Sequence, residues 1–127
     1  MEPQVIRSKG APAAIGPYSQ ATQVGGFVFC SGQIPLDPKT MQVVEGGVEE
    51  QTRQVLENLT HVLQAAGCGL GDVAKTTIFL TDMADFKAVN TIYGEVFGDF
   101  RPARATVAVA GLPLGVLVEI ECVAHCG

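Results

Sequence analysis

The chain has 127 residues, of which 47% are hydrophobic and 17% are charged, and its formal net charge at pH 7 is -5. This length suits a single domain with its own hydrophobic core, which we expect to span residues 1–127. The negative net charge, with only eight Lys and Arg residues, argues against a nucleic-acid partner. Small-molecule ligands are expected instead. The high apolar content predicts a surface that another subunit covers.

The cysteines and histidines predict neither a cross-link nor a metal site. The four cysteines, Cys30, Cys68, Cys122 and Cys126, contain no C-x-x-C pair. On a strand, Cys122 and Cys126 would lie too far apart to bridge, so we expect reduced, mostly buried thiols in a cytoplasmic protein. His61 and His125 lack a second ligand at metal spacing.

No membrane association is expected. The N-terminal residues lack the apolar segment of a signal peptide. The uncharged run at residues 105–118 is shorter than the ~20 residues that span a bilayer, and glycine and proline interrupt it.

The first half of the chain predicts short strands and then a long helix. Strands are expected over residues 5–8, 20–24, 27–31 and 41–44. Gly25-Gly26 joins the second of these to the third as a two-residue hairpin turn. From residue 48 the apolar residues recur at helical spacing, and Gly67 marks the end of that helix.

The second half predicts a strand, a helix and two further strands. The strands are expected over residues 73–80, 104–110 and 116–125, and the helix begins after Thr81 or Asp82 and ends before Pro102. The order is that of an α+β fold in which two helices cover one face of a mixed sheet. The other face must then find its cover in a second subunit.

Strand alternation suggests where Arg104 points. If the last two strands form a hairpin, Thr106 lies opposite Glu119 and Arg104 opposite Glu121, on the face away from the helices. Two interpretations of Arg104 stay open. It forms a cross-strand ion pair with one of the glutamates, or it is the two-pronged donor for a substrate carboxylate while Glu119 handles a proton or a water.

Three other polar side chains have structural explanations when each is taken singly. Ser31 lacks a nucleophile elbow and a nearby base, so it is a strand-end hydroxyl beside Gly32. Asn90 is an amide on the apolar face of the second helix. Tyr18 is a packing residue with its hydroxyl at the surface.

Five segments, taken together and in order, resemble the Rid (reactive intermediate deaminase, or YjgF) family. They are APAAIGPYSQA at 11–21, SGQIPLDP at 31–38, NLTHVLQAAG at 58–67, FKAVNTIYGEVF at 86–97 and RPARATVAVAGLPLGVLVEIE at 101–121. The resemblance implies a chorismate-mutase-like fold that assembles as a homotrimer around a sheet-lined barrel, with a site between neighbouring subunits. It also implies hydrolysis of 2-enamino and 2-imino acids, such as 2-aminoacrylate and 2-iminopropanoate, to 2-keto acids and ammonia, with no metal or organic cofactor.

By position, the resemblance implies that Arg104 clamps the substrate carboxylate and that Glu119 positions or activates the water. The other implied pocket residues, partly supplied by the adjacent subunit, are Tyr18, Ser31, Gly32, Asn90 and Thr106. Thr106 stands where many relatives have cysteine, so thiol chemistry has no part at that position.

Two other functions are weighed against the deaminase. One is a non-catalytic trimer in which Arg104 binds a keto acid or another carboxylate as a regulatory signal. The other is the ribonuclease activity attributed to some relatives, which the acidic charge disfavours.

Overall fold

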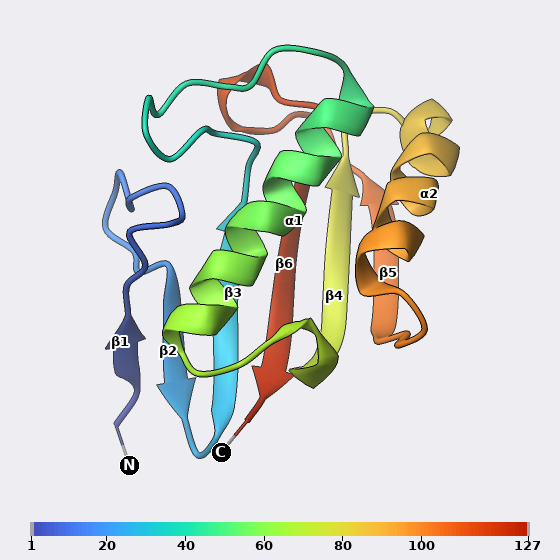
Figure 1. Cartoon of the computed structure of the whole chain (residues 1–127). Coiled ribbons are helices and arrows are strands. Elements are labelled where there is room, and N and C mark those ends of the chain that lie inside the picture. Colours follow the sequence, from blue (N-terminus) through green and yellow to red (C-terminus); the bar gives the residue numbers. More distant parts are fainter. Residues whose placement is uncertain (1, 127) are drawn as a thin grey trace.

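A six-stranded mixed sheet carries two helices on one face in the computed structural model, which describes residues 2–126 (Figure 1). The strands are β1 (Gln4–Ile6), β2 (Ala21–Val24), β3 (Phe27–Gln33), β4 (Val73–Leu80), β5 (Ala103–Ala108) and β6 (Val118–His125). The helices are α1 (Val48–Ala65) and α2 (Phe86–Phe97). The strand order is β1-β2-β3-β6-β4-β5, and only β4 and β5 run parallel. The predicted α+β class is therefore confirmed.

Several locally encoded elements follow the prediction. β2 and β3 form the expected hairpin, and its two turn residues have positive φ angles, 57° at Gly25 and 84° at Gly26. Glycine adopts such angles without the steric cost of a Cβ. α1 begins at the predicted residue, and Gly67, with φ of 81°, follows its end.

The strand predicted over residues 41–44 is wrong, because this segment belongs to a tight loop. Met41 has a φ of 58°, and its N–H donates to the carbonyl of Asp37 at 2.7 Å. A single bridge between Leu36 and Val43 is the only strand-like pairing assigned there within residues 2–126. The turn folds the segment back on itself, so it does not extend along the sheet.

The predicted hairpin of the last two strands is also wrong, because β4 lies between them. β5 pairs in parallel with β4, and β6 pairs antiparallel with the other edge of β4. Parallel neighbours need a crossover connection, which α2 supplies. The segment between β5 and β6 then passes the end of β4, where the N–H of Thr81 donates to the carbonyl of Leu117.

This topology puts Arg104 and Glu119 on opposite faces of the sheet. Thr76, which is 1% exposed beneath α2, is the register partner of both Arg104 and Cys122, so these three share the helix-covered face. Phe79 is the partner of Glu119, and both face away from the helices. The predicted placement of Arg104 beside the two glutamates is therefore corrected.

The two faces of the sheet differ in cover. α1 packs its apolar side on the sheet, and the resulting core has its most enclosed side chains at positions such as Val28, Leu59, Val62 and Ile120. The opposite face keeps large apolar side chains exposed, among them Phe27 at 45%, Phe29 at 46% and Val107 at 43%. The helices thus cover one face only, as predicted.

The cysteines depart from the prediction of reduced thiols. Cys68, in the loop after α1, forms a disulfide with Cys126, and their Cα atoms lie 5.7 Å apart. Cys30 and Cys122 are free, buried and paired across β3 and β6. Cys122 and Cys126 do not bond to each other, as expected, but the chain end brings Cys126 to a thiol 58 residues away. Within residues 2–126, neither helix is long and apolar enough to cross a membrane.

Candidate functional site

One face of α2 forms a wall beside the start of β5. Phe86, Asn90 and Tyr93 are spaced four and three residues apart, so their side chains share one side of the helix. α2 begins after Asp82, whose carboxylate accepts the N–H of Ala84 at 2.8 Å and caps the short turn that leads into the helix. Because α2 connects β4 to β5, these three side chains face Arg104 at the start of β5.

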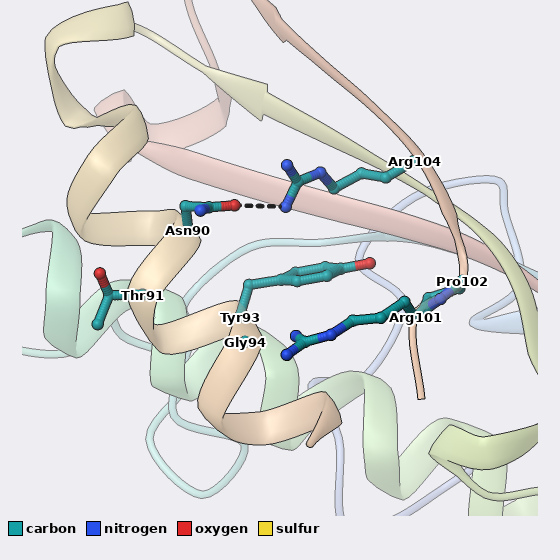
Figure 2. Close-up of a pocket in the computed structure, with 7 residues that line it drawn as sticks. All are labelled: Asn90, Thr91, Tyr93, Gly94, Arg101, Pro102 and Arg104. Atoms are coloured by element: carbon teal, nitrogen blue, oxygen red, sulfur yellow. Dashed lines mark hydrogen bonds between the residues drawn. The ribbon is translucent and has the colours of Figure 1, made fainter. Parts of the chain in front are cut away.

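Three contacts hold the Arg104 guanidinium. Nη1 donates to Oδ1 of Asn90 at 2.7 Å, and Cζ lies 5.6 Å from the ring centre of Phe86 and 5.0 Å from that of Tyr93. Figure 2 shows the Arg104 and Asn90 side chains pointing toward each other above the Tyr93 ring. Stacking on aromatic faces and one hydrogen bond orient a guanidinium while leaving its other donors available.

A hydrogen bond to the sheet fixes the Tyr93 side chain. Its hydroxyl and the buried Thr76 hydroxyl are 2.7 Å apart and share a hydrogen bond. Burial raises the pKa of Tyr93 above its ordinary value, although the Thr76 hydrogen bond and the Arg104 charge act in the opposite direction. The phenol therefore stays neutral and serves as a fixed platform for the arginine.

A pocket of about 620 Å³ opens along this wall. Its lining residues are Asn90, Thr91, Tyr93, Gly94, Arg101, Pro102 and Arg104. The lining includes no acidic side chain, and among residues 2–126 no carboxylate forms an ion pair with Arg104. The cross-strand ion pair considered for Arg104 is therefore excluded. An unpaired guanidinium at a pocket of this size is suited to bind a small carboxylate.

A second group of predicted residues lies on the open face, around Gly32. The pairing of β3 with β6 is irregular between Cys30 and Gln33, as in a β-bulge. A Cβ added at Gly32 would overlap the carboxylate of Glu119, so only glycine lets that side chain lie across the strand. The Ser31 hydroxyl donates to the carbonyl of Ser19 at 2.6 Å, which ties the bulge to the loop before β2.

The Glu119 carboxylate is half-buried in this group. Burial raises its pKa above the ordinary value, and the nearby charge of Glu121 raises it further. A carboxylate with a raised pKa exchanges protons closer to neutral pH, as a general acid or base does.

Comparisons with known proteins place the chain in a family. The Endoribonuclease L-PSP family model matches residues 8–126. The chain belongs to the Rid (YjgF) family. It is 56% identical over 126 residues to a RutC family protein of Synechocystis, covering 98% of this chain and 97% of that one. It is 53% identical over 121 residues to the 2-iminobutanoate/2-iminopropanoate deaminase of Mus musculus, covering 95% and 90%.

A solved Rid structure has the same fold. RidA from the Antarctic bacterium Psychrobacter sp. PAMC 21119 superposes with a TM-score of 0.94 at 45% identity, covering 97% of this chain and 99% of that chain. The Rid-family resemblance seen in the five sequence segments is thus confirmed over almost the whole chain.

The structure of this Rid-family chain brings some predicted residues together and separates others. Asn90 contacts Arg104. Gly32 lies against the Glu119 carboxylate, and Ser31 lies on β3, which pairs with the strand that carries Glu119. Tyr18 lines a different hollow, on the loop before β2, and its side chain is 49% exposed. Thr106 shares the face of Arg104 but does not line its pocket, and its hydroxyl is buried without a hydrogen-bond partner among the described residues.

Sequence reasoning identified Asn90 and Arg104 of the pocket lining as site residues and missed the rest of it, together with Phe86, whose ring contacts Arg104. Phe86 and Tyr93 belong to the segment 86–97 that carries the family resemblance, but neither they nor Arg101 were singled out as site residues. The spacing of Phe86, Asn90 and Tyr93 on one helix face, followed by a strand that begins near an arginine, is the signal that could have found them.

One set of side chains has metal-ligating atoms close together. Atoms of Cys68, Asp72 and Cys126 lie within 4.8 Å of one another. The two sulfurs are bonded to each other, so neither is a thiolate that could bind a metal ion. The Asp72 carboxylate also accepts the N–H of Gly69 at 2.8 Å, as part of the turn before β4.

Proposed function

We propose that this Rid-family protein hydrolyses reactive 2-enamino and 2-imino acids to 2-keto acids and ammonia, as a 2-iminobutanoate/2-iminopropanoate deaminase-type hydrolase. The observation that carries the proposal is the Arg104 guanidinium, which Asn90 and two aromatic rings orient at a pocket and which no carboxylate of the described chain neutralises. Full-length similarity to a protein named for this activity supports it.

The reaction needs a positioned water more than a strong nucleophile. Arg104 binds the substrate carboxylate through two parallel N–H donors and so fixes the imine carbon beside it. Glu119 accepts a proton from the attacking water while the water oxygen bonds to that carbon. Glu119 then returns that proton to the amine nitrogen, the C–N bond breaks as the C–OH group becomes the keto C=O, and the hydroxyl proton leaves with the ammonia as ammonium. The proposal invokes no metal or organic cofactor, because an iminium carbon is already electrophilic.

The same proposal includes a homotrimer with a site between subunits. Arg104 and Glu119 lie on opposite faces of one sheet, so a substrate that contacts both must meet them from two copies of the chain. We place Arg104 and Asn90 on one side of the shared site, and Tyr18, Ser31, Gly32 and Glu119 on the other. Thr106 supports the Arg104 side.

The exposed apolar side chains of the open face support this assembly. Phe27, Phe29 and Val107 lie on the side that the helices leave bare, where packing of three sheets into a chorismate-mutase-like barrel would cover them. We propose one Rid-type domain over residues 1–127. Its localisation to the cytoplasm stays a prediction, and reducing conditions there would oppose the Cys68–Cys126 bond.

The test is the hydrolysis rate of imines that an amino-acid oxidase generates in situ and semicarbazide traps. The wild type should lower semicarbazone formation from 2-iminobutanoate. Arg104→Lys should lose at least about tenfold in kcat/KM, because a point charge cannot replace the two-pronged clamp. Arg53→Lys, an exposed arginine paired with Glu95 on the helices, is the matched control.

Three outcomes would change the proposal. No acceleration by the wild type, with keto-acid binding that depends on Arg104, would favour the non-catalytic carboxylate-binding trimer. Normal turnover by Arg104→Lys would remove the clamp role. RNA cleavage that disappears on changing a site residue would favour the activity in the family model's name, which the net charge of -5 disfavours.

A further inference from the structure

The Arg104 pocket contains a second cation that the proposed reaction does not use. Arg101 lines the same pocket, and among residues 2–126 it forms no ion pair. The chain has 13 acidic residues against eight basic ones, so unpaired arginines are not a consequence of scarce carboxylates. Two unneutralised guanidinium groups at one pocket create a strongly positive local field that favours an anionic ligand.

The two arginines occupy separate places on this wall. Figure 2 draws the Tyr93 ring between the Arg104 guanidinium above it and the Arg101 guanidinium below it. Arg101 lies along α2 at Gly94, where an added Cβ would come 3.4 Å from its Nη1. Both charges act to lower the pKa of the Tyr93 phenol, which agrees with their positions around that ring.

This separation limits what the second cation can do. A single carboxylate engaged by both prongs of Arg104 has its oxygens satisfied on the Asn90 side of Tyr93. Arg101, on the other side of the ring, is then available to a different acidic group of the same ligand. Its guanidinium has no hydrogen-bond acceptor among the described residues, unlike that of Arg104.

We propose that Arg101 binds a second carboxylate on the substrate side chain, so that the pocket prefers imino dicarboxylic acids over imino acids with apolar side chains. This inference rests on the proposed imine hydrolysis and names its substrate class. The reaction is the same: water adds to the imine carbon, the C–N bond breaks, and an oxo dicarboxylic acid and ammonia leave. The distal carboxylate takes no part in bond making and contributes binding only.

The experiment compares 2-iminoglutarate with 2-iminopentanoate, which has the same chain length without the distal carboxylate. Both are generated by oxidases from the parent amino acids and followed by semicarbazide competition. Arg101→Gln should lower kcat/KM for 2-iminoglutarate by about tenfold or more, mainly through KM, and change that for 2-iminopentanoate by less than about twofold. Arg101→Lys should recover part of the loss.

The control variant is Lys87→Gln, which removes an equal charge from α2, the helix that Arg101 lies along, at a position outside this pocket. An equal loss with both imines, or a similar loss in Lys87→Gln, would overturn the role of Arg101. Dissociation of the oligomer by Arg101→Gln in size-exclusion chromatography would instead make Arg101 a subunit-contact residue and would also overturn it.

A binding measurement separates this inference from the proposed function. Calorimetry of 2-oxoglutarate and 2-oxopentanoate with the wild type and Arg101→Gln requires no catalysis. If the wild type hydrolyses neither imine but binds 2-oxoglutarate more tightly through Arg101, the deaminase proposal fails and the dicarboxylate site stands. If hydrolysis occurs and Arg101→Gln binds both acids as the wild type does, the deaminase stands and the dicarboxylate site fails.

Discussion

The α2–β5 wall and the bulge around Gly32 each hold one of the two groups proposed for catalysis, and they hold them differently. On the wall, Arg104 is exposed but fixed by one hydrogen bond and two aromatic rings. At the bulge, Glu119 is half-buried and lies in the space that a missing Cβ leaves at Gly32. Contacts between side chains thus position Arg104 on the wall, whereas the space beside the Gly32 backbone positions Glu119 at the bulge.

The difference shows why neither region is a complete site. The lining of the wall pocket has positive charge for carboxylates and no acidic side chain, while the bulge has a carboxylate whose pKa is raised by burial and by Glu121, with no cation of residues 2–126 among the causes. The sheet lies between them, because Arg104 and Glu119 face opposite sides. In the proposed reaction, the two regions therefore complement each other only where two copies of the chain meet.

The largest expected effect tests this complementation. Arg104→Ala and Glu119→Gln should each lose at least about a hundredfold in imine hydrolysis, because charge-assisted contacts to the substrate and water disappear. Co-expressed with two different affinity tags and purified through both, the two variants should form mixed trimers in which about one site in three is intact. Activity should then recover to about one-third of the wild-type value.

The control for this experiment is a mixed trimer of two differently tagged Arg104→Ala chains, which has no intact site. If the mixed preparation stays as inactive as its components, the two residues do not meet across a subunit boundary. The proposal that the wall and the bulge each supply half of a shared site would then be wrong.

An intermediate effect separates a site shaped by backbone from one shaped by side chains. Gly32→Ala should lower kcat by roughly tenfold to a hundredfold, because the new Cβ displaces the Glu119 carboxylate from its place. Gly94→Ala is the matched change on the wall. It meets only the flexible end of Arg101 and should leave 2-iminobutanoate turnover within about threefold while favouring the helix.

Both variants are to be assayed for 2-iminobutanoate turnover and for thermal unfolding. Equal activity losses, or a loss in Gly94→Ala alone, would contradict the idea that the bulge depends on backbone space and the wall does not.

The smallest expected effect concerns stability and pH. The folded-state pKa of Glu119 is raised, so the folded protein binds more protons than the unfolded chain as pH rises past 4.5, and stability is lost in that range. Glu119→Gln should therefore unfold at higher denaturant concentration than the wild type at about pH 8, with the advantage gone below 4.5. Glu45→Gln, in the exposed loop before α1, removes the same charge as a control. A stability difference that persists unchanged at low pH would show that ionisation of Glu119 is not its cause.

Prediction from sequence succeeded where the signal is local. The period of the apolar residues identified α1, and the β-branched run from Val73 to Leu80 identified β4 with its observed bounds. The pair Gly25-Gly26 identified the hairpin, because positive φ angles at two adjacent residues suit glycine. Strand alternation and the family resemblance both pointed to Arg104 and Glu119, although the strand pairing used to assign their faces was wrong.

The amino-acid sequence by itself determined most of the segments that become helices and strands, which helix face is apolar, and several of the turns, since these depend on neighbours within a few residues; the loop at 41–44 was the exception. Only the tertiary structure decided that β4 separates β5 from β6, and so put Arg104 under α2 beside Asn90 and away from Glu119. It also decided that Cys68 meets Cys126. The physical reason is the same in both cases. Strand partners and thiol partners are chosen by how the whole chain packs, which no local pattern encodes.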